Sequence, residues 1–543
     1  MMYLFNKIVF SIKRDKDFLY LFFILSILTY GMLVFNLTLH ADDWRVFQID
    51  KFQFDWVVQL GRWLQRVIWT IFDDNYFVPV FSMAFLLFFI YLSSLLIFKT
   101  LKMGIVSFYV FVIMFSFHSI LVEIVGFEMA HIPLGFAILF SSISFYFLIE
   151  SLKLFLDKIF IKSLFNLLIS SISLSFVASI YQPIVFISLQ LVIFYIIYNL
   201  FMNKNILSKI VFLYITMVLL SIIFYIIEIK ISLIIFDIQG LHVGSTYTFR
   251  LFSNFNIFVL YSFDLFKNFI FYEQYSIPLA VKYLFLFGLF YLIILSFQRL
   301  VIKNAIISLS LLSILIFSPF ILGLLVNDVA SFRPNALISI ASLYAIIFSL
   351  LYELVKEKYK YIILILISYI IIIFIFQHNK ISIMSITNNK RDFAIANRIL
   401  NRIETSPNYS TIRELESYDL IVVGVGLQNI SKGKVFNSIS SFNKNTLGFN
   451  SIIPKDMNII SRDIGVFSLP FGQIEYIFKL LGSNDSLNYY NWTRLPKNYN
   501  KKLIIDKLKN ANPWPSKDSV IEFKNGYILV LNDNYKKIIN AKK

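Results

Sequence analysis

Runs of about twenty apolar residues recur along the first two thirds of the chain, and they limit its fold more than any other feature. A backbone inside a bilayer must satisfy its own hydrogen bonds, so only helices and closed barrels cross one. The chain is 58% hydrophobic and 15% charged, whereas a soluble protein is about 25% charged. The sequence therefore predicts a polytopic α-helical membrane protein.

Hydropathy predicts eleven membrane-crossing helices. They lie at about 18–38, 77–98, 103–122, 129–149, 163–180, 182–201, 208–229, 277–298, 304–325, 335–355 and 361–376. Charged residues are almost absent from the middle of these helices, and Lys282 is near enough to a helix end for its ammonium group to reach the membrane surface. Cysteine is absent, which excludes disulfides and thiolate metal sites.

The loops between these helices fall into two sets. One set carries most of the lysine and arginine: Lys99, Lys102, Lys153, Lys158, Lys162, Lys204, Lys209, Arg299, Lys303, Lys356, Lys358 and Lys360. The other set carries most of the acids. Because cytoplasmic loops hold the excess of basic residues, the acidic loops and the C-terminal tail are predicted to lie outside.

The first outer loop contains an amphipathic segment. Its apolar side is formed by Trp56, Leu60, Trp63, Val67 and Ile71, and its polar side by Gln59, Arg62, Gln65 and Arg66. This pattern predicts a helix that lies in the membrane interface. Arg62 and Arg66 are four residues apart, so they would share a helical face and could bind a phosphate together. Nonspecific lipid binding explains the pair equally well.

Paired carboxylates precede this helix. Asp42 and Asp43 follow the first helix directly, with Trp44 and Arg45 beside them. A carboxylate at a desolvated interface can act as a general base, although acids at a helix end are also common. Glu123 and Glu128 in the second outer loop are alternative catalytic acids. Arg45, Arg250 and Arg333 are further arginines in outer loops and candidate phosphate ligands.

The polar tail from Gln377 onward reads as a separate domain, so we expect a transmembrane domain at 1–376 and a small soluble α/β domain at 377–543. Residues 391–404 have the pattern of an amphipathic helix, and 419–426 that of a buried strand. Residues 520–531 predict a hairpin with Asn525-Gly526 at its turn. The tail carries most of the net charge of +17, which favours anionic lipids or glycans as partners; no nucleic-acid motif accompanies the basic residues.

Four short features resemble one family. Tyr30-Gly31 ends the first helix, Asp42-Asp43 lies in the outer loop, Gly61-Arg62-Trp63 follows, and Tyr181-Gln182 lies in a short outer turn. Together they resemble the Gtr glucosyl transferase family, the O-antigen glucosyltransferases of serotype-converting phages, over about the first 350 residues. A plain turn explains Tyr181-Gln182 on its own.

The resemblance implies a GT-C type glycosyltransferase of the bacterial inner membrane. It would transfer glucose from undecaprenyl phosphate to O-antigen glycan on the periplasmic side, where the C-terminal domain would also lie. Asp42 and Asp43 become candidate catalytic acids and Arg62 a donor-phosphate ligand, with Trp44, Trp63, Tyr181 and Gln182 as substrate-binding candidates. No cofactor is assigned, and dependence on a divalent metal stays open. A flippase or a polymerase for lipid-linked saccharides is the alternative function.

The orientation generates the first testable prediction. Reporter fusions should give a cytoplasmic signal after Lys99 and a periplasmic signal after Lys390, because eleven crossings from an inside N-terminus end outside. A cytoplasmic signal after Lys390 would mean that the apolar stretch 251–272 crosses the membrane too, rather than lying in the interface as we expect.

Overall fold

The computed structural model describes residues 16–36, 51–72, 78–122, 130–204, 206–240, 277–325, 338–407, 409, 418–423, 487–491, 495, 499–512, 516–523, 526–530 and 536. These residues divide into two compact units. The first contains the described residues up to Ile383, and the second begins at Met384. The first unit is helical, and the second contains a small sheet.

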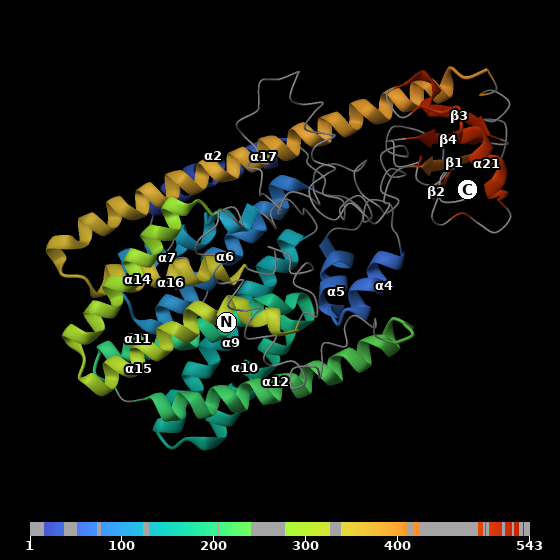
Figure 1. Ribbon diagram of the computed structural model, residues 1–543. Coiled ribbons are helices and arrows are strands. Elements are labelled where there is room, and N and C mark those ends of the chain that lie inside the picture. The colour runs from blue at the N-terminus through green and yellow to red at the C-terminus, as the bar shows by residue number, and fades with distance from the viewer. Residues whose placement is uncertain are drawn as a thin grey trace. The chain divides into compact units, whose positions relative to one another are not determined.

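The helices that begin in the first unit follow one another along the chain, and the last of them, α17, continues past Met384 (Figure 1). They are α2 (Lys16–Val34), α4 (Lys51–Gln59), α5 (Trp63–Phe72), α6 (Pro79–Leu101), α7 (Ile105–Ser116), α9 (His131–Leu156), α10 (Phe160–Tyr181), α11 (Val185–Phe201), α12 (Leu207–Ile235), α14 (Leu279–Arg299), α15 (Ile302–Phe317), α16 (Ser339–Leu354) and α17 (Lys360–Glu404). Short 3-10 turns, among them η1 (Ser119–Leu121), η3 (Gln182–Ile184) and η5 (Ser318–Leu325), join several of them.

Among the described residues, eight helical segments are long and apolar enough to cross a membrane. One of them, Phe160–Phe201, contains both α10 and α11, which separate at the extended backbone of Tyr181 (φ −155°). Two further apolar helices, Ile105–Leu121 and Ser339–Leu354, are shorter. Each of the eleven predicted segments overlaps one of these helices. The membrane character of the chain is supported, and the number of crossings stays a prediction.

Serine side chains hold α9 and α10 close together. The hydroxyls of Ser144 and Ser170 lie 3.2 Å apart, and Ser170 also donates to the Ser144 carbonyl at 2.7 Å. Ser151 and Ser163 each donate to the other's carbonyl, at 2.8 and 2.9 Å. Small side chains let two backbones approach closely, and their hydroxyls bond across the interface where water is absent. The helix pair is therefore packed tightly, and α12 packs against both helices, because the sulfur of Met217 lies 3.5 Å from the Ser144 hydroxyl and 2.8 Å from the Ser170 hydroxyl.

Buried polar groups are also found deeper in the first unit. Gln190 on α11 donates to the Ser318 hydroxyl at 2.8 Å and accepts from Ser342 on α16. Lys282 on α14 is only 1% exposed. Its side chain is therefore enclosed by protein, and the position of its ammonium group relative to the membrane surface stays a prediction.

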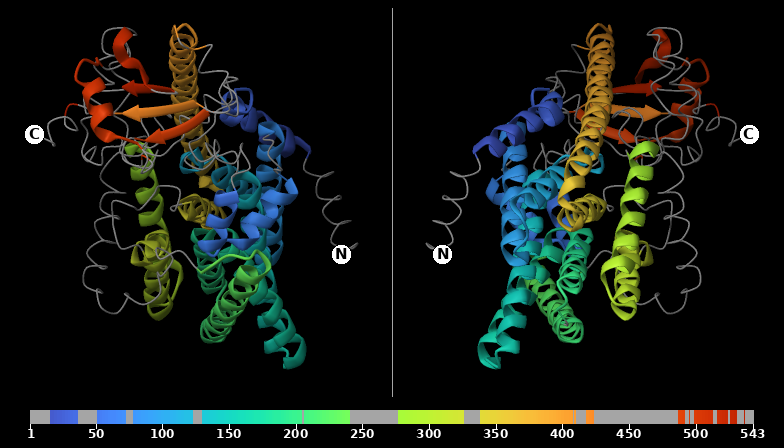
Figure 2. Two further views of the ribbon diagram at one scale, coloured as in Figure 1. Left: turned by 90° about the vertical axis from the view of Figure 1, so that its right-hand side faces the viewer. Right: turned by 90° about the vertical axis from the view of Figure 1, so that its left-hand side faces the viewer.

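Helix α17 joins two segments that the sequence separates. The predicted membrane helix at 361–376 and the predicted amphipathic helix at 391–404 form one continuous helix of 45 residues, Lys360–Glu404 (Figure 2). No glycine or proline occurs between these segments to interrupt it. The change to polar composition at Gln377 thus marks no break in the helix, and the domain boundary proposed there stays a prediction.

The second unit contains a four-stranded sheet in the order β2-β1-β4-β3. β1 (Tyr418–Val423) is parallel to β2 (Leu487–Asn491) and β4 (Gly526–Val530), while β3 (Val520–Phe523) pairs antiparallel with β4. The strand predicted at 419–426 and the hairpin predicted at 520–531 are both confirmed for the residues described. The predicted position of Gly526 in the turn is wrong, because Gly526 begins β4 and pairs with Phe523.

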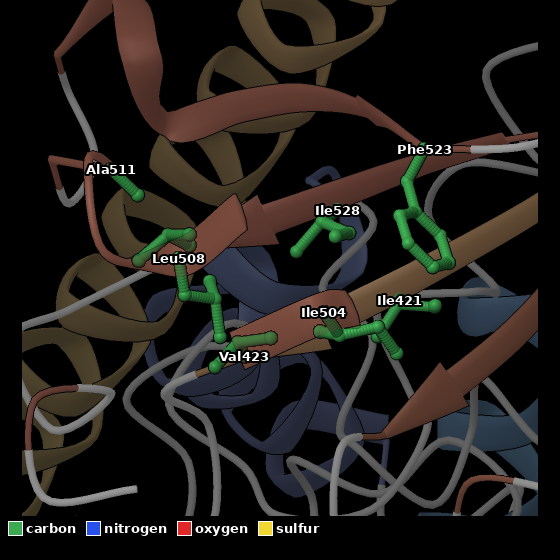
Figure 3. Packing of buried hydrophobic residues seen from close by; sticks show 8 residues of the cluster. Ile421, Val423, Ile504, Leu508, Ala511, Phe523 and Ile528 are labelled. Atoms are coloured by element: carbon green, nitrogen blue, oxygen red, sulfur yellow. The ribbon is translucent and has the colours of Figure 1, made fainter. Parts of the chain in front are cut away.

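The core of this sheet lies between its strands and α21 (Lys501–Leu508). Figure 3 shows Ile421, Val423 and Ile528 facing Ile504 and Leu508 of the helix. Gly526 opposes Asp419 in the β1–β4 register, and a Cβ there would stand 2.0 Å from the Asp419 carbonyl oxygen. Only glycine fits at the first residue of β4, because any side chain there would clash with the backbone of β1.

Candidate active site

A glycine divides the predicted interfacial helix into two. Helix α4 ends at Gln59 and α5 begins at Trp63, with Gly61 between them at φ +77°. A Cβ at Gly61 would lie 2.4 Å from the Tyr225 hydroxyl oxygen of α12. The prediction of one continuous helix is therefore wrong. The left-handed turn, which favours glycine, redirects the chain and places Arg62 immediately before α5.

The turn brings Arg62 to the end of α10. Its Nε donates to Oε1 of Gln182 at 2.8 Å, and its guanidinium lies 4.9 Å from the centre of the Tyr181 ring. Gln182 in turn donates from Nε2 to the Leu60 carbonyl at 3.0 Å and to the Tyr225 hydroxyl at 3.3 Å. We call Arg62, Tyr181, Gln182 and Tyr225 the Arg62 cluster. Three of its members were predicted site residues, and the fold brings them together across 120 positions of sequence.

Arg66 has different surroundings from Arg62. Its Nη1 lies 2.8 Å from Oδ1 of Asp55 on α4, and its guanidinium lies 4.2 Å from the centre of the Phe236 ring. Asp55 therefore forms an ion pair with Arg66, whereas Gln182 orients Arg62. The two arginines have different neighbours, and their joint binding of one phosphate stays a prediction.

Trp63 supports the start of α5. Its ring meets Phe176 of α10 edge to face, with centroids 6.3 Å apart. Its buried Nε1 has no hydrogen-bond partner among the described residues. An indole N–H normally finds a partner when it is buried. This is compatible with a substrate-binding role for Trp63, which stays a prediction.

Glu228 on α12 adds a carboxylate that the sequence did not predict. Oε1 accepts from the Ser175 hydroxyl at 2.6 Å and Oε2 from the Ser179 hydroxyl at 2.8 Å. The predicted helix ended at residue 229, which made Glu228 a helix-end residue, but α12 continues to Ile235. Ser175 and Ser179 are four residues apart and form a polar stripe on one face of α10, whereas Gln182 begins η3 after the extended backbone of Tyr181. That stripe was the sequence signal for a polar partner on a neighbouring helix, which the structure shows to be Glu228.

A comparison with models of known protein families identifies the family of this chain. The model of the family described as Glucosyl transferase GtrII matches residues 31–350, more than half of the chain. The chain belongs to the GtrII glucosyl transferase family. The predicted resemblance is thereby confirmed, and the protein is a glucosyltransferase. No significant match was found among curated proteins or among solved structures.

The GtrII match contains the whole Arg62 cluster and Glu228, while the described residues of the second unit lie beyond it. It also contains the remaining predicted site residues, which all lie outside the described residues. These are Asp42, Asp43, Trp44, Arg45, Glu123, Glu128, Arg250 and Arg333. Their roles stay predictions. Within the described part of the chain, no group of three or more histidines and acids is arranged to hold a metal ion.

The geometry predicts that Gln182 fixes the orientation of Arg62 in this GtrII protein. Gln182→Leu keeps the side-chain size and removes three hydrogen bonds, so we expect glucosyl transfer by isolated membranes to fall about 10- to 100-fold. Asn199→Leu is the matched control, because the Asn199 side chain bonds to Tyr195 of its own helix, through the carbonyl and the side chain. Equal activity of Gln182→Leu and wild type, at equal protein amounts, would contradict this role.

Proposed function

We propose that this GtrII glucosyltransferase takes glucose from a polyprenyl phosphate on the periplasmic side of the inner membrane and adds it to O-antigen glycan. The observation that carries this proposal is the Arg62 cluster. The Gln182 amide and the Tyr181 ring hold the Arg62 guanidinium in a fixed plane, which suits recognition of a phosphate oxygen.

The charges at the two ends of α10 support the periplasmic side of the membrane. Lys158 and Lys162 lie at its beginning, and the Arg62 cluster lies at its end. Lys204 and Lys209 flank the beginning of α12, while Tyr225 lies towards the end of that helix. Because lysine-rich ends are cytoplasmic, the cluster belongs at the opposite, periplasmic surface. Nucleotide sugars are cytoplasmic, which leaves a lipid-linked sugar as the donor available there.

The proposed reaction needs a base and a charge stabiliser. An acceptor hydroxyl attacks the anomeric carbon, its proton passes to a carboxylate, and the bond from the anomeric carbon to the phosphate oxygen breaks. Asp42 or Asp43 would accept the proton. Arg62 would stabilise the charge on the departing polyprenyl phosphate, assisted by the other outer arginines, Arg45, Arg66, Arg250 and Arg333. In this proposal the C-terminal unit binds the glycan acceptor.

The catalytic acids can be tested by isosteric replacement. We expect Asp42→Asn or Asp43→Asn to lower transfer by a factor of about 100 or more, with normal membrane levels, because the amide cannot take the proton. Rates of glucose transfer by purified protein would measure this. Near-normal rates in both variants would place the base elsewhere, with Glu123 and Glu128 as the next candidates.

The donor can be tested with purified substrates. We expect transfer from polyprenyl-phosphate glucose and none from a nucleotide glucose. Arg62→Ala should lower the rate about 100-fold or more, and Arg62→Lys should lower it less, because lysine keeps the charge but loses the planar fork. Arg299→Ala, at the opposite membrane surface by the loop charges, is the control and should be unchanged. Movement of the lipid-linked sugar across vesicles without a new glycosidic bond would instead support a flippase.

A further inference from the structure

Glu228 is an ionisable side chain inside an apolar helix. It lies seven residues before the end of α12, a helix long enough to cross a membrane. Its two hydrogen bonds come from serine hydroxyls, and no lysine or arginine among the described residues lies within ion-pair distance of it. A carboxylate in such a place is costly, and residues of this kind usually serve function.

Two buried serines fix the position of this carboxylate. Ser175 is 1% exposed and Ser179 is fully buried, while Glu228 itself is only half-buried. The serines therefore hold its inner side. Each carboxylate oxygen has two lone pairs, and each uses one for a serine, so two acceptor sites remain in a fixed geometry.

Helix packing alone does not explain a carboxylate at this position. A glutamine could also bond with Ser175 and Ser179 across the α10–α12 interface, without the cost of burying a charge. What the carboxylate adds is a stronger acceptor, because hydrogen bonds to ionised groups are about twice as strong as neutral ones.

The carboxylate also lies next to the Arg62 cluster. Glu228 and Tyr225 are three residues apart on α12, so they share one face of the helix. The Tyr225 hydroxyl accepts from Gln182, whose Oε1 binds Arg62. A phosphate at Arg62 would thus be connected to Glu228 through Gln182 and Tyr225, the residue one helical turn before Glu228. In the donor, the sugar is attached directly to that phosphate.

We propose that Glu228 accepts hydrogen bonds from hydroxyl groups of the donor sugar and so contributes to sugar specificity. This rests on the proposed function, in which Arg62 binds the donor phosphate. The sugar class follows from the chemistry, since a fixed carboxylate with two remaining acceptor sites matches neighbouring hydroxyl donors. The Tyr225 ring and hydroxyl would border the same subsite.

The test compares donors that each lack one hydroxyl. Purified protein in lipid nanodiscs is given polyprenyl-phosphate glucose and its 2-, 3-, 4- and 6-deoxy analogues. For wild type, at least one analogue should react about 10- to 100-fold more slowly than the parent, the effect of one hydrogen bond to a charged group. Glu228→Gln should slow the parent donor by a similar factor and remove most of the penalty for that analogue.

Controls separate sugar contact from stability. Glu150→Gln, at a carboxylate that pairs with Lys153 at 2.6 Å near the other end of the membrane helices, should change neither rate nor selectivity. Glu228→Asp keeps the charge and replaces Glu228→Gln if the latter does not accumulate; it should alter the ranking of the analogues. A loss that is equal for all donors in either Glu228 variant would overturn the proposal and leave Glu228 as a packing residue.

A binding measurement separates this proposal from the proposed function. Saturation-transfer NMR with methyl glucoside detects sugar contact without any transfer. Suppose the wild-type protein contacts the glucoside more strongly than Glu228→Gln does, yet transfers nothing from the lipid donor. That result would support the sugar subsite and contradict the proposed donor. Equal contact in wild type and variant, together with unchanged selectivity, would reject the subsite.

Discussion

The hydrogen bond from Arg62 to Gln182 connects two distant parts of the membrane unit. It joins the short helices α4 and α5 to the junction of α10 and α11, and Gln182 adds bonds to the Leu60 carbonyl and to Tyr225 of α12. The side chain of one glutamine thus holds three segments in register. Gly61 makes this arrangement possible. It adopts the left-handed turn before Arg62, and it has no Cβ that would clash with the Tyr225 hydroxyl. Gln182 and the Tyr181 ring together fix the position and the plane of the Arg62 guanidinium.

The sequence predicted most of the architecture and part of the site. Apolar runs located the membrane helices because length and hydropathy are local properties. Motif spacing identified Arg62, Tyr181 and Gln182, and the structure brings them together. The strand at β1 and the β3–β4 hairpin were also predicted, since alternation and an Asn-Gly turn are local signals.

Other features depend on contacts that no local pattern shows. Periodicity around Gly61 predicts a continuous helix, and only the neighbouring Tyr225 reveals the turn. The shared spacing of Arg62 and Arg66 does not show that Asp55 forms an ion pair with Arg66. Glu228 was overlooked because its partners, Ser175 and Ser179, lie on another helix. The burial of Lys282 was not predicted, because it depends on contacts with other parts of the chain.

The reciprocal serine bonds between α9 and α10 bear on how the protein is built during synthesis. Ser151 and Ser163 are twelve residues apart, and Ser144 and Ser170 are twenty-six apart, so both pairs can form as soon as these two helices have entered the bilayer. Closing such short loops costs little chain entropy. The hairpin can therefore assemble before α12 is made, and its α10 stripe then offers Ser175 and Ser179 to the arriving Glu228. A charged residue that would hinder insertion of an isolated helix meets its hydrogen-bond donors already in place.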